Sequence, residues 1–385
     1  MTNSIKPIKP TVALVRCSSY DPGELDLAVT KGLAFLGGAK SLFESQQKLL
    51  LKPNVLIGEN PDKHVTTHPA VFAAVARALK EAGTQLTYGD SPAFGPPSIS
   101  TSLAGIAAEA EKLGIPLADF VNGQEVPFPE GMLIKQFLLA KGVLEADAVV
   151  CLPKFKTHAL TRITGAVKNL FGCIPGLTKS EFHANLMNEV QFGRMLYDLS
   201  RLINPPLCIM DAVIGMEGNG PRNGTPRRLN LLLFSNDATA LDVVMARLIN
   251  LDPLLVPTLA AAQAHQPDTL EDIVLVGEDL DACRIPDFDV NRNPGSTTLK
   301  KGFWSNALRQ LASPRPVIDP GKCRICGTCV QICPVSPKAL SFENNDSKSV
   351  PIYNYDLCIR CYCCQETCPY DAIYVKTPLL GKIIH

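Results

Sequence analysis

The sequence predicts an α/β protein: a mostly parallel sheet with helices on both faces, followed by a small cysteine-rich α+β domain at the C-terminus. Two observations predict this arrangement. Apolar segments of strand length alternate with segments of helical period over residues 11–279, which is typical of a parallel sheet covered on both sides. Nine of the fourteen cysteines lie between 323 and 368, and eight of these form two regular runs.

The elements of the larger part follow in order. We expect strands at 11–17, 48–54, 85–92, 147–154, 206–214, 228–236 and 272–279, and helices at 24–37, 69–83, near 99–113 and at 237–251. The 69–83 segment has the 3.6-residue period and a closing glycine, and the 237–251 segment starts at an Asp. The domain boundaries we predict are 1–282 for the α/β domain, 283–318 for a partly packed linker with a short helical piece around Trp304, and 319–385 for the cysteine-rich domain.

Composition limits the class of protein. A chain of 385 residues with 46% hydrophobic and 19% charged residues fits two or three globular domains. Lys+Arg and Asp+Glu both number 37, so no net field points to nucleic acid or to a membrane surface. The start, MTNSIKPIKP, lacks the apolar core of a signal peptide, and no apolar run reaches the length of a membrane span. We therefore expect a cytoplasmic protein with no membrane span, in which clustered cysteines indicate metal and not disulfides.

Each cysteine run has the spacing C-x2-C-x2-C-x3-C-P. Three closely spaced thiolates can bind one [4Fe-4S] cluster within a tight loop, and the fourth ligates the opposite cluster. We therefore predict two [4Fe-4S] clusters, one on Cys323, Cys326, Cys329 and Cys368, the other on Cys358, Cys361, Cys364 and Cys333. Zinc is the competing metal, but its sites use paired C-x2-C arms. Cys363 has no place in either set, and we expect it to pack away from the clusters.

Residues 319–376 resemble the bacterial two-cluster ferredoxins. The segment repeats internally, because PKALSF follows the first Cys-Pro and YDAIYV follows the second. We expect short equivalent strands at 339–340 and 372–373.

Polar residues collect where the predicted strands end, and ligands of open α/β sheets bind at the carboxyl ends of the strands. Lys52 and Asn54 end one strand, Asp90 another, Lys154 a third and Asp211 a fourth. Any one of these residues has an ordinary interpretation as a cap, a turn or a solvated loop. Four such ends together indicate a site.

The stretch from Ala148 to Ser180 contains five cations and no Asp or Glu. In a chain of balanced charge this excess indicates an anionic ligand, either a carboxylate or a phosphate. The backbone N–H groups at Gly165-Ala166 would add to such a site if a helix begins there. A solvated basic face or a docking surface is the open alternative.

The loop GMEGNGPRNGTPRR at 215–228 superficially resembles a dinucleotide-binding sequence. A strand and not a helix is expected after it, which argues against a Rossmann fingerprint. The loop either closes over an anion with Arg222, Arg227 and Arg228, or forms a tight structural turn.

Several short motifs taken together resemble the domain of unknown function 362 family over roughly residues 11–280. They are LKPN, THP, GDSP, PKFKTH, TGAVKNLFG, GMEGNGPRNG and the helix with Asp237 and Asp242. The resemblance implies an α/β fold, cytoplasmic and often anaerobic hosts, and a C-terminal ferredoxin module, but no reaction. The site residues it implies are Lys52, Asn54, His68, Asp90, Lys154, Lys156, His158, Lys168, Asn169 and His183.

The combination predicts an iron–sulfur oxidoreductase that passes electrons between the clusters and an anionic substrate or organic cofactor. His158 or His183 would move protons, and Lys154, Lys156 and Lys168 would hold negative charge. A flavin or deazaflavin would link one- and two-electron chemistry, although the sequence has no fingerprint for one. The alternatives are an electron-transfer or docking subunit with a redox partner protein, and a non-redox enzyme with structural or sensing clusters.

Overall fold

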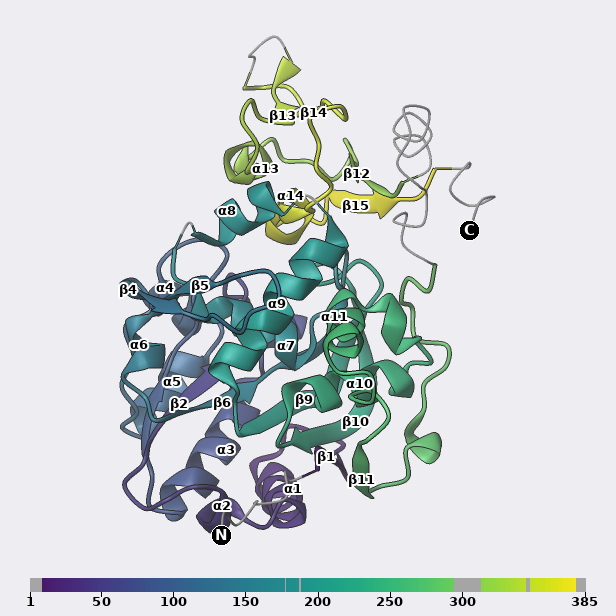
Figure 1. The fold of residues 1–385 in the computed structure, drawn as a ribbon. Coiled ribbons are helices and arrows are strands. Elements are labelled where there is room, and N and C mark those ends of the chain that lie inside the picture. The colour runs from purple at the N-terminus through teal and green to yellow at the C-terminus, as the bar shows by residue number, and fades with distance from the viewer. Residues whose placement is uncertain (1–8, 177, 187, 294–312, 344–346, 379–385) are drawn as a thin grey trace.

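The computed structural model describes residues 9–176, 178–186, 188–293, 313–343 and 347–378. Figure 1 shows a larger α/β domain with a small lobe above it, which we call the C-terminal module (residues 313–378). The short helical piece expected around Trp304 lies outside the described residues.

A nine-stranded mixed sheet forms the centre of the α/β domain. Its main path runs in the order β11-β1-β10-β9-β6-β2-β3, and β7 and β8 extend it beside β9. The pairs β1–β11, β9–β6, β6–β2, β2–β3 and β7–β9 are parallel, whereas β10 is antiparallel to both neighbours. The bounds are β1 (Thr11–Arg16), β2 (Lys48–Pro53), β3 (Gln85–Tyr88), β6 (Ala148–Leu152), β7 (Lys154–His158), β8 (Arg162–Ile163), β9 (Leu207–Glu217), β10 (Thr225–Ser235) and β11 (Val274–Gly277).

Helices cover both faces of this sheet, which confirms the predicted fold class. Alternate residues of each strand point to opposite faces, so Val12 and Leu14 join one core while Ala13 and Val15 join the other. The first core is covered by α7 (Gly165–Asn169), α9 (Glu189–Ile203), α10 (Ala238–Leu248) and α11 (Pro257–His265). The second is covered by α1 (Pro22–Phe35), α3 (Pro69–Glu81) and α5 (Ile106–Lys112).

The remaining elements of this domain are short. They are α2 (Ala39–Leu42), α4 (Pro97–Leu103), α6 (Lys141–Leu144), α8 (Thr178–Asn185), the 3-10 turns at Pro61–Lys63, Leu170–Cys173, Pro253–Leu255 and Asp281–Cys283, and the hairpin of β4 (Gly123–Pro127) and β5 (Gln136–Ala140). The helix expected near 99–113 is divided into α4 and α5 at Gly105, whose φ of +72° favours glycine.

The strand expected at 147–154 is longer than its apolar run. After Pro153 the chain continues as β7, with the sequence KFKTH, and all five residues are buried. Polar residues lie in a buried strand here because their side chains have partners, as described below.

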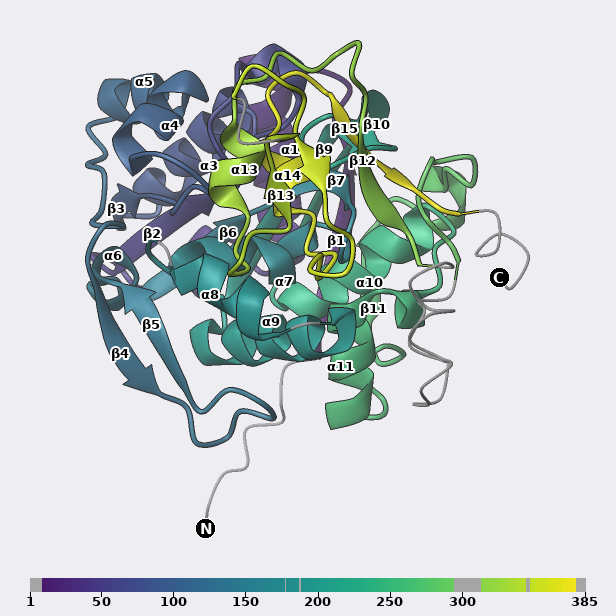
Figure 2. The same ribbon diagram turned by 90° about the horizontal axis from the view of Figure 1, so that it is seen from above.

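The C-terminal module contains two short antiparallel pairs. β12 (Arg315–Ile318), within the expected linker, pairs with β15 (Ile373–Lys376), and β13 (Leu340–Ser341) pairs with β14 (Ile352–Tyr353). α13 (Thr328–Ile332) follows the first cysteine loop and α14 (Cys363–Thr367) the second. Seen from above, the module covers the carboxyl ends of the central strands beside α8 and α9 (Figure 2).

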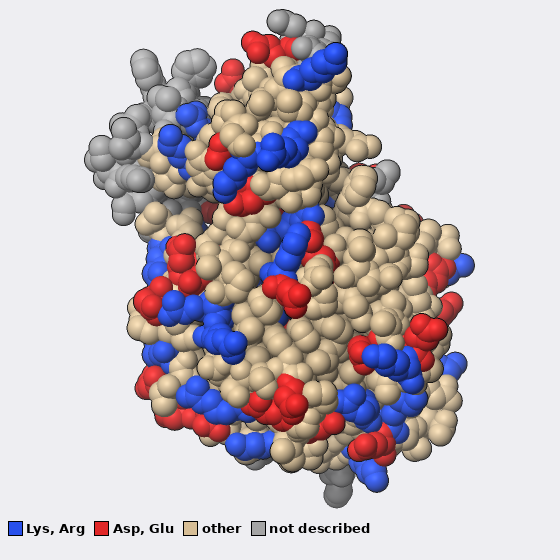
Figure 3. Space-filling model, turned by 180° about the vertical axis from the view of Figure 1, so that it is seen from behind, with Lys and Arg blue, Asp and Glu red and all other residues tan. Residues whose placement is uncertain are grey.

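Charges of both signs are interspersed over the face in Figure 3, in agreement with the balanced composition. None of the helices in the described part of the chain has the length and hydropathy needed to cross a bilayer.

Candidate functional site

Two hollows in the C-terminal module are lined by the two predicted cysteine sets. One is lined by Cys323, Cys326, Cys329 and Cys368, and the other by Cys333, Cys358, Cys361 and Cys364. Counted with open solvent, they hold about 340 and about 330 Å³ of atom-free space. Four thiols around each hollow, one of them from the opposite run, fit the crossed ligation of two [4Fe-4S] clusters.

The backbone of the two loops repeats the same conformation. Ile325 (φ +54°) and Gly327 (φ +73°) in the first loop correspond to Arg360 (φ +61°) and Tyr362 (φ +62°) in the second. A left-handed conformation is costly for a β-branched residue such as Ile325. Its recurrence at equivalent positions indicates that both loops wrap around a common kind of centre.

A third hollow, which we call the lobe cavity, lies between the module and the α/β domain. The wall from the module contains Ile332, Cys363, Glu366 and Thr367. The wall from the α/β domain contains Asn54, Leu56, Asp90, Ser91, Ala93, Lys168, Asn169, Phe171, Gly172, Gly176, Lys179, Ser180 and His183. Cys363, absent from both cluster hollows, thus faces the lobe cavity, one residue from the predicted ligand Cys364.

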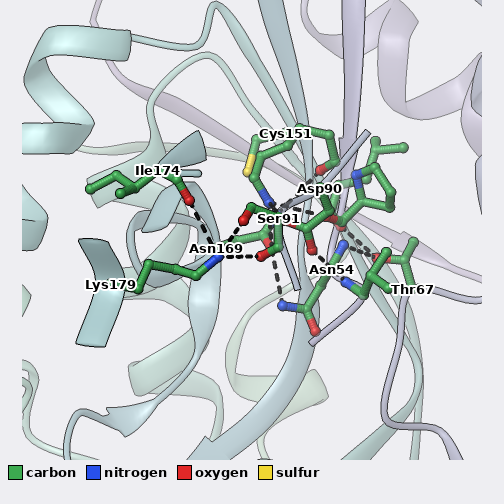
Figure 4. Close-up of polar contacts among 12 residues, drawn as sticks. Asn54, Thr67, Asp90, Ser91, Cys151, Asn169, Ile174 and Lys179 are labelled. Carbon is green, nitrogen blue, oxygen red and sulfur yellow. Dashed lines mark hydrogen bonds and ion pairs between the residues drawn. The ribbon is translucent and has the colours of Figure 1, made fainter. Parts of the chain in front are cut away.

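The floor of the lobe cavity is a hydrogen-bonded network (Figure 4). Lys52 Nζ lies 2.8 Å from Asp90 Oδ1, and both side chains are buried. Asn169 Oδ1 accepts a hydrogen bond from Asn54 Nδ2 at 3.0 Å. Lys156 Nζ donates to Asn54 Oδ1 and to the Val65 carbonyl, both at 2.7 Å. Burial, together with repulsion from Lys168, lowers the pKa of Lys156 to about 7.

One glycine is required by this floor. A Cβ atom on Gly172 would lie 1.8 Å from Asp90 Oδ1 and 2.8 Å from Lys52 Nζ. No side chain fits there without displacing the ion pair, which explains the last glycine of TGAVKNLFG.

The cations around the lobe cavity differ in their bonding. Lys179 Nζ donates to both the carbonyl and the hydroxyl of Ser91 and to the carbonyl of Ile174 (Figure 4). Lys168, in contrast, is half-buried and has no hydrogen-bond or ion-pair partner among the described residues; its Nζ lies 5.0 Å from the centre of the Phe171 ring. Lys168 is therefore the lining lysine whose ammonium group lacks a hydrogen-bond acceptor among the described residues, although the Glu366 carboxylate interacts with it electrostatically.

His183 lies on the same wall. Its ring stacks on Phe192, with centroids 4.4 Å apart, and its buried Nδ1 has no hydrogen-bond partner in the described part of the chain. Burial lowers the pKa of His183 to about 4. His183 and Lys168 thus line the same cavity, and each has hydrogen-bonding capacity that the described residues leave unused.

A buried charged contact joins the two lobes. Glu366 Oε1 lies 3.0 Å from His158 Nε2, at ion-pair distance but without hydrogen-bond alignment. Burial alone would raise the pKa of Glu366, but His158 and Lys168 outweigh it and lower that pKa to about 2.

The loop at 215–228 holds the module and does not enclose an anion. Arg222 donates to Glu59 and, from Nη1, to the Thr367 carbonyl at 2.6 Å, and Asn223 Nδ2 donates to the Cys368 carbonyl at 3.1 Å. Arg227 pairs with Asp287, and Arg228 donates to the Ser18 carbonyl. The anion-closing alternative for these arginines is therefore wrong, and the loop is an interface.

The expected anion site at Gly165-Ala166 is also wrong. The Asp242 carboxylate accepts hydrogen bonds from Ala166 N at 2.5 Å and Val167 N at 3.0 Å, so these groups are already satisfied.

The structure divides the ten residues of the predicted site into three groups. Asn54, Asp90, Lys168, Asn169 and His183 line the lobe cavity, while Lys52, Lys156 and His158 lie directly behind it. Lys154 and His68 lie elsewhere, around Asp211: Lys154 Nζ is 2.7 Å from Asp211 Oδ2, and His68 N donates to the same oxygen.

Sequence reasoning missed the wall contributed by the module. Cys363, Glu366 and Thr367 have i, i+3, i+4 spacing, which places them on one face of α14. This spacing, offset by one residue from the predicted ligands Cys364 and Cys368, could have indicated from the sequence that one face of this helix points away from the clusters.

Comparisons with known proteins match both parts of the chain. The profile described as a domain of unknown function (DUF362) matches residues 49–247, and that of a 4Fe-4S dicluster domain matches residues 315–369. A thylakoid-associated protein of Synechocystis is 38% identical over 254 residues, covering 66% of this chain and 78% of that protein. An uncharacterized ferredoxin of Methanocaldococcus jannaschii is 32% identical over 60 residues, covering 16% of this chain and 75% of that protein.

Among solved structures, the lactate racemase apoprotein from Thermoanaerobacterium thermosaccharolyticum aligns with a TM-score of 0.37 and 13% identity. The alignment covers 57% of this chain and 54% of that one.

Proposed function

The chain belongs to the domain of unknown function 362 family and carries a 4Fe-4S dicluster domain, and from this premise we propose that it is an iron–sulfur oxidoreductase. Two [4Fe-4S] clusters would exchange electrons with an anionic substrate or organic cofactor bound in the lobe cavity. The expected setting is the cytoplasm, and cell fractionation would test whether the protein is instead associated with membranes, as the name of the Synechocystis relative states for that protein.

One observation carries the proposal. α14 provides the predicted ligand Cys364 and, with Cys363, Glu366 and Thr367, one wall of a cavity whose opposite wall holds the unpaired Lys168. A ligand on Lys168 would lie across a single helix from a cluster. The clusters would supply one electron at a time at low potential.

The residues of the chain would share the remaining work. Lys168 would hold the negative charge of the ligand, and His183 would donate or accept a hydrogen bond. The floor formed by Lys52, Asp90 and Asn169 would keep the cavity in shape, since its polar groups satisfy one another. His158, which contacts Glu366, would be a candidate for moving a proton, as would His183.

The test is an anaerobic preparation of the full-length protein, analysed by mass spectrometry for any molecule that copurifies. We expect an anionic molecule whose amount falls in Lys168→Met at unchanged iron content, and whose redox state changes when the clusters are reduced with dithionite. A copurified molecule that is unchanged by reduction would refute the redox role. A stable complex with another protein and no bound molecule would favour a docking subunit instead.

A further inference from the structure

The lobe cavity limits the size of its ligand. Its hollow measures about 740 Å³ when open solvent at the mouth is included, but its enclosed volume is only about 90 Å³. A cavity of about 150 Å³ holds benzene, with about six non-hydrogen atoms. The enclosed part therefore takes about four such atoms, and the three fused rings of a flavin or deazaflavin do not fit inside it.

The charges limit the kind of ligand. The ammonium groups of Lys52 and Lys179 are already bound, the first by Asp90 and the second by Ser91 and Ile174. Among the described cations that line the cavity, Lys168 alone is left without an acceptor. The Glu366 carboxylate on the module wall interacts with Lys168, whereas Lys179 is bound by uncharged oxygens only. The lining therefore keeps one positive charge in excess, which balances one negative charge on a ligand, because a second buried negative charge would lack compensation.

The remaining lining favours a carboxylate with a short organic part. His183 Nδ1 is buried and unpartnered, and can bond to a second oxygen of the ligand. The Phe171 ring and the Ile332 side chain supply apolar surface in the same cavity. We propose that the lobe cavity binds a short-chain monocarboxylate of about two or three carbons, its carboxylate on Lys168 and His183, and that no flavin enters it.

This inference rests on the proposed function for the location of the ligand site, but it does not depend on electron transfer between the clusters and the ligand. Binding can be measured with oxidised clusters and no reductant, so a failure of electron transfer leaves the result intact. Conversely, the oxidoreductase proposal survives if a larger cofactor binds at Lys168.

The test is calorimetric titration of the anaerobic, iron-loaded, full-length protein with acetate and propionate, and in separate runs with citrate and flavin mononucleotide. We expect one site for acetate or propionate and none for the two larger molecules. Loss of the charge-assisted hydrogen bond in Lys168→Met should weaken binding roughly tenfold or more. Lys168→Arg, which keeps the charge, should retain most of it.

Two controls separate binding from misfolding. Lys31→Met removes an exposed lysine on α1 and should bind acetate as the unmodified protein does. Ala93→Trp places a large side chain at a half-buried position of the cavity lining and should abolish binding without removing a charge. Flavin binding that is lost in Lys168→Met would overturn the inference. So would the absence of monocarboxylate binding, or acetate binding that is equal in Lys168→Met.

Discussion

The Lys154–Asp211 pair allows the sharpest energetic prediction. Both side chains are fully buried, with Nζ and Oδ2 2.7 Å apart. Asp211 also accepts hydrogen bonds from the Tyr20 hydroxyl at 3.0 Å and from His68 N at 2.9 Å. Among the described residues, Asp211→Ala leaves Lys154 with the Tyr20 hydroxyl as its one hydrogen-bond partner. Removing one member of a buried pair costs about 3–5 kcal/mol, a large part of the total stability of a typical domain.

The assay is urea unfolding of the full-length protein, followed by circular dichroism. With a slope near 3 kcal/mol/M, the loss moves the midpoint by about 1 M or more. The double variant Asp211→Ala/Lys154→Met should recover most of the loss, because no unpaired charge stays buried. Asp272→Ala breaks an exposed pair with Lys9 and should leave the midpoint unchanged. A single variant as stable as the unmodified protein, or a double variant no better than the single, would refute the reasoning.

Three further predictions concern the clusters, the lobe interface and pH. Cys364→Ser should reduce the iron content from about eight atoms per chain, measured on anaerobic protein, whereas Cys363→Ser should leave it unchanged; iron loss in the second variant would contradict the assigned register. Arg222→Ala removes the hydrogen bonds to Glu59 and to the Thr367 carbonyl. Amide hydrogen exchange in α14 and β15 should therefore become roughly tenfold faster. An unchanged exchange rate would show that the loop at 215–228 does not anchor the module. Burial raises the pKa of Asp242 from 3.8 to about 7, so between these pH values the folded state keeps a proton that the unfolded state loses. The free energy of unfolding should therefore fall as pH rises from about 4 to about 7. Unfolding experiments at several pH values should show this slope in the unmodified protein and not in Asp242→Asn.

Much of the fold could be predicted because the apolar periods are strong. The 237–251 helix begins at its predicted Asp, since the Asp237 side chain accepts a backbone hydrogen bond. The cap of the 69–83 helix was not predicted: the His68 side chain accepts the hydrogen bond there. The direction of β10 was not predicted, because an apolar run carries no sign of its orientation. β7 was missed as a strand because KFKTH is polar, and only tertiary partners such as Asp211 and Asn54 make its burial possible.

The structure brings most, but not all, of the predicted site residues together. Strand ends brought Lys52, Asn54 and Asp90 together, as the topology of such sheets requires. The sequence does not separate a lysine that holds a ligand from one that is fully paired in the interior, and Lys154 is of the second kind. The distinction depends on which carboxylate lies next to each lysine. That carboxylate is distant in the chain, as Asp211 is from Lys154, so the sequence does not identify it.

The position of α14 has a consequence for maturation. α14 contains Cys364 near its start and is followed by Cys368, so the two proposed clusters would each hold one end of this helix. Before the proposed iron–sulfur clusters are bound, the ligand bonds that would hold Glu366 and Thr367 in position on this helix are absent. If the proposed clusters bind there, the supply of iron would therefore control when this wall of the lobe cavity is complete.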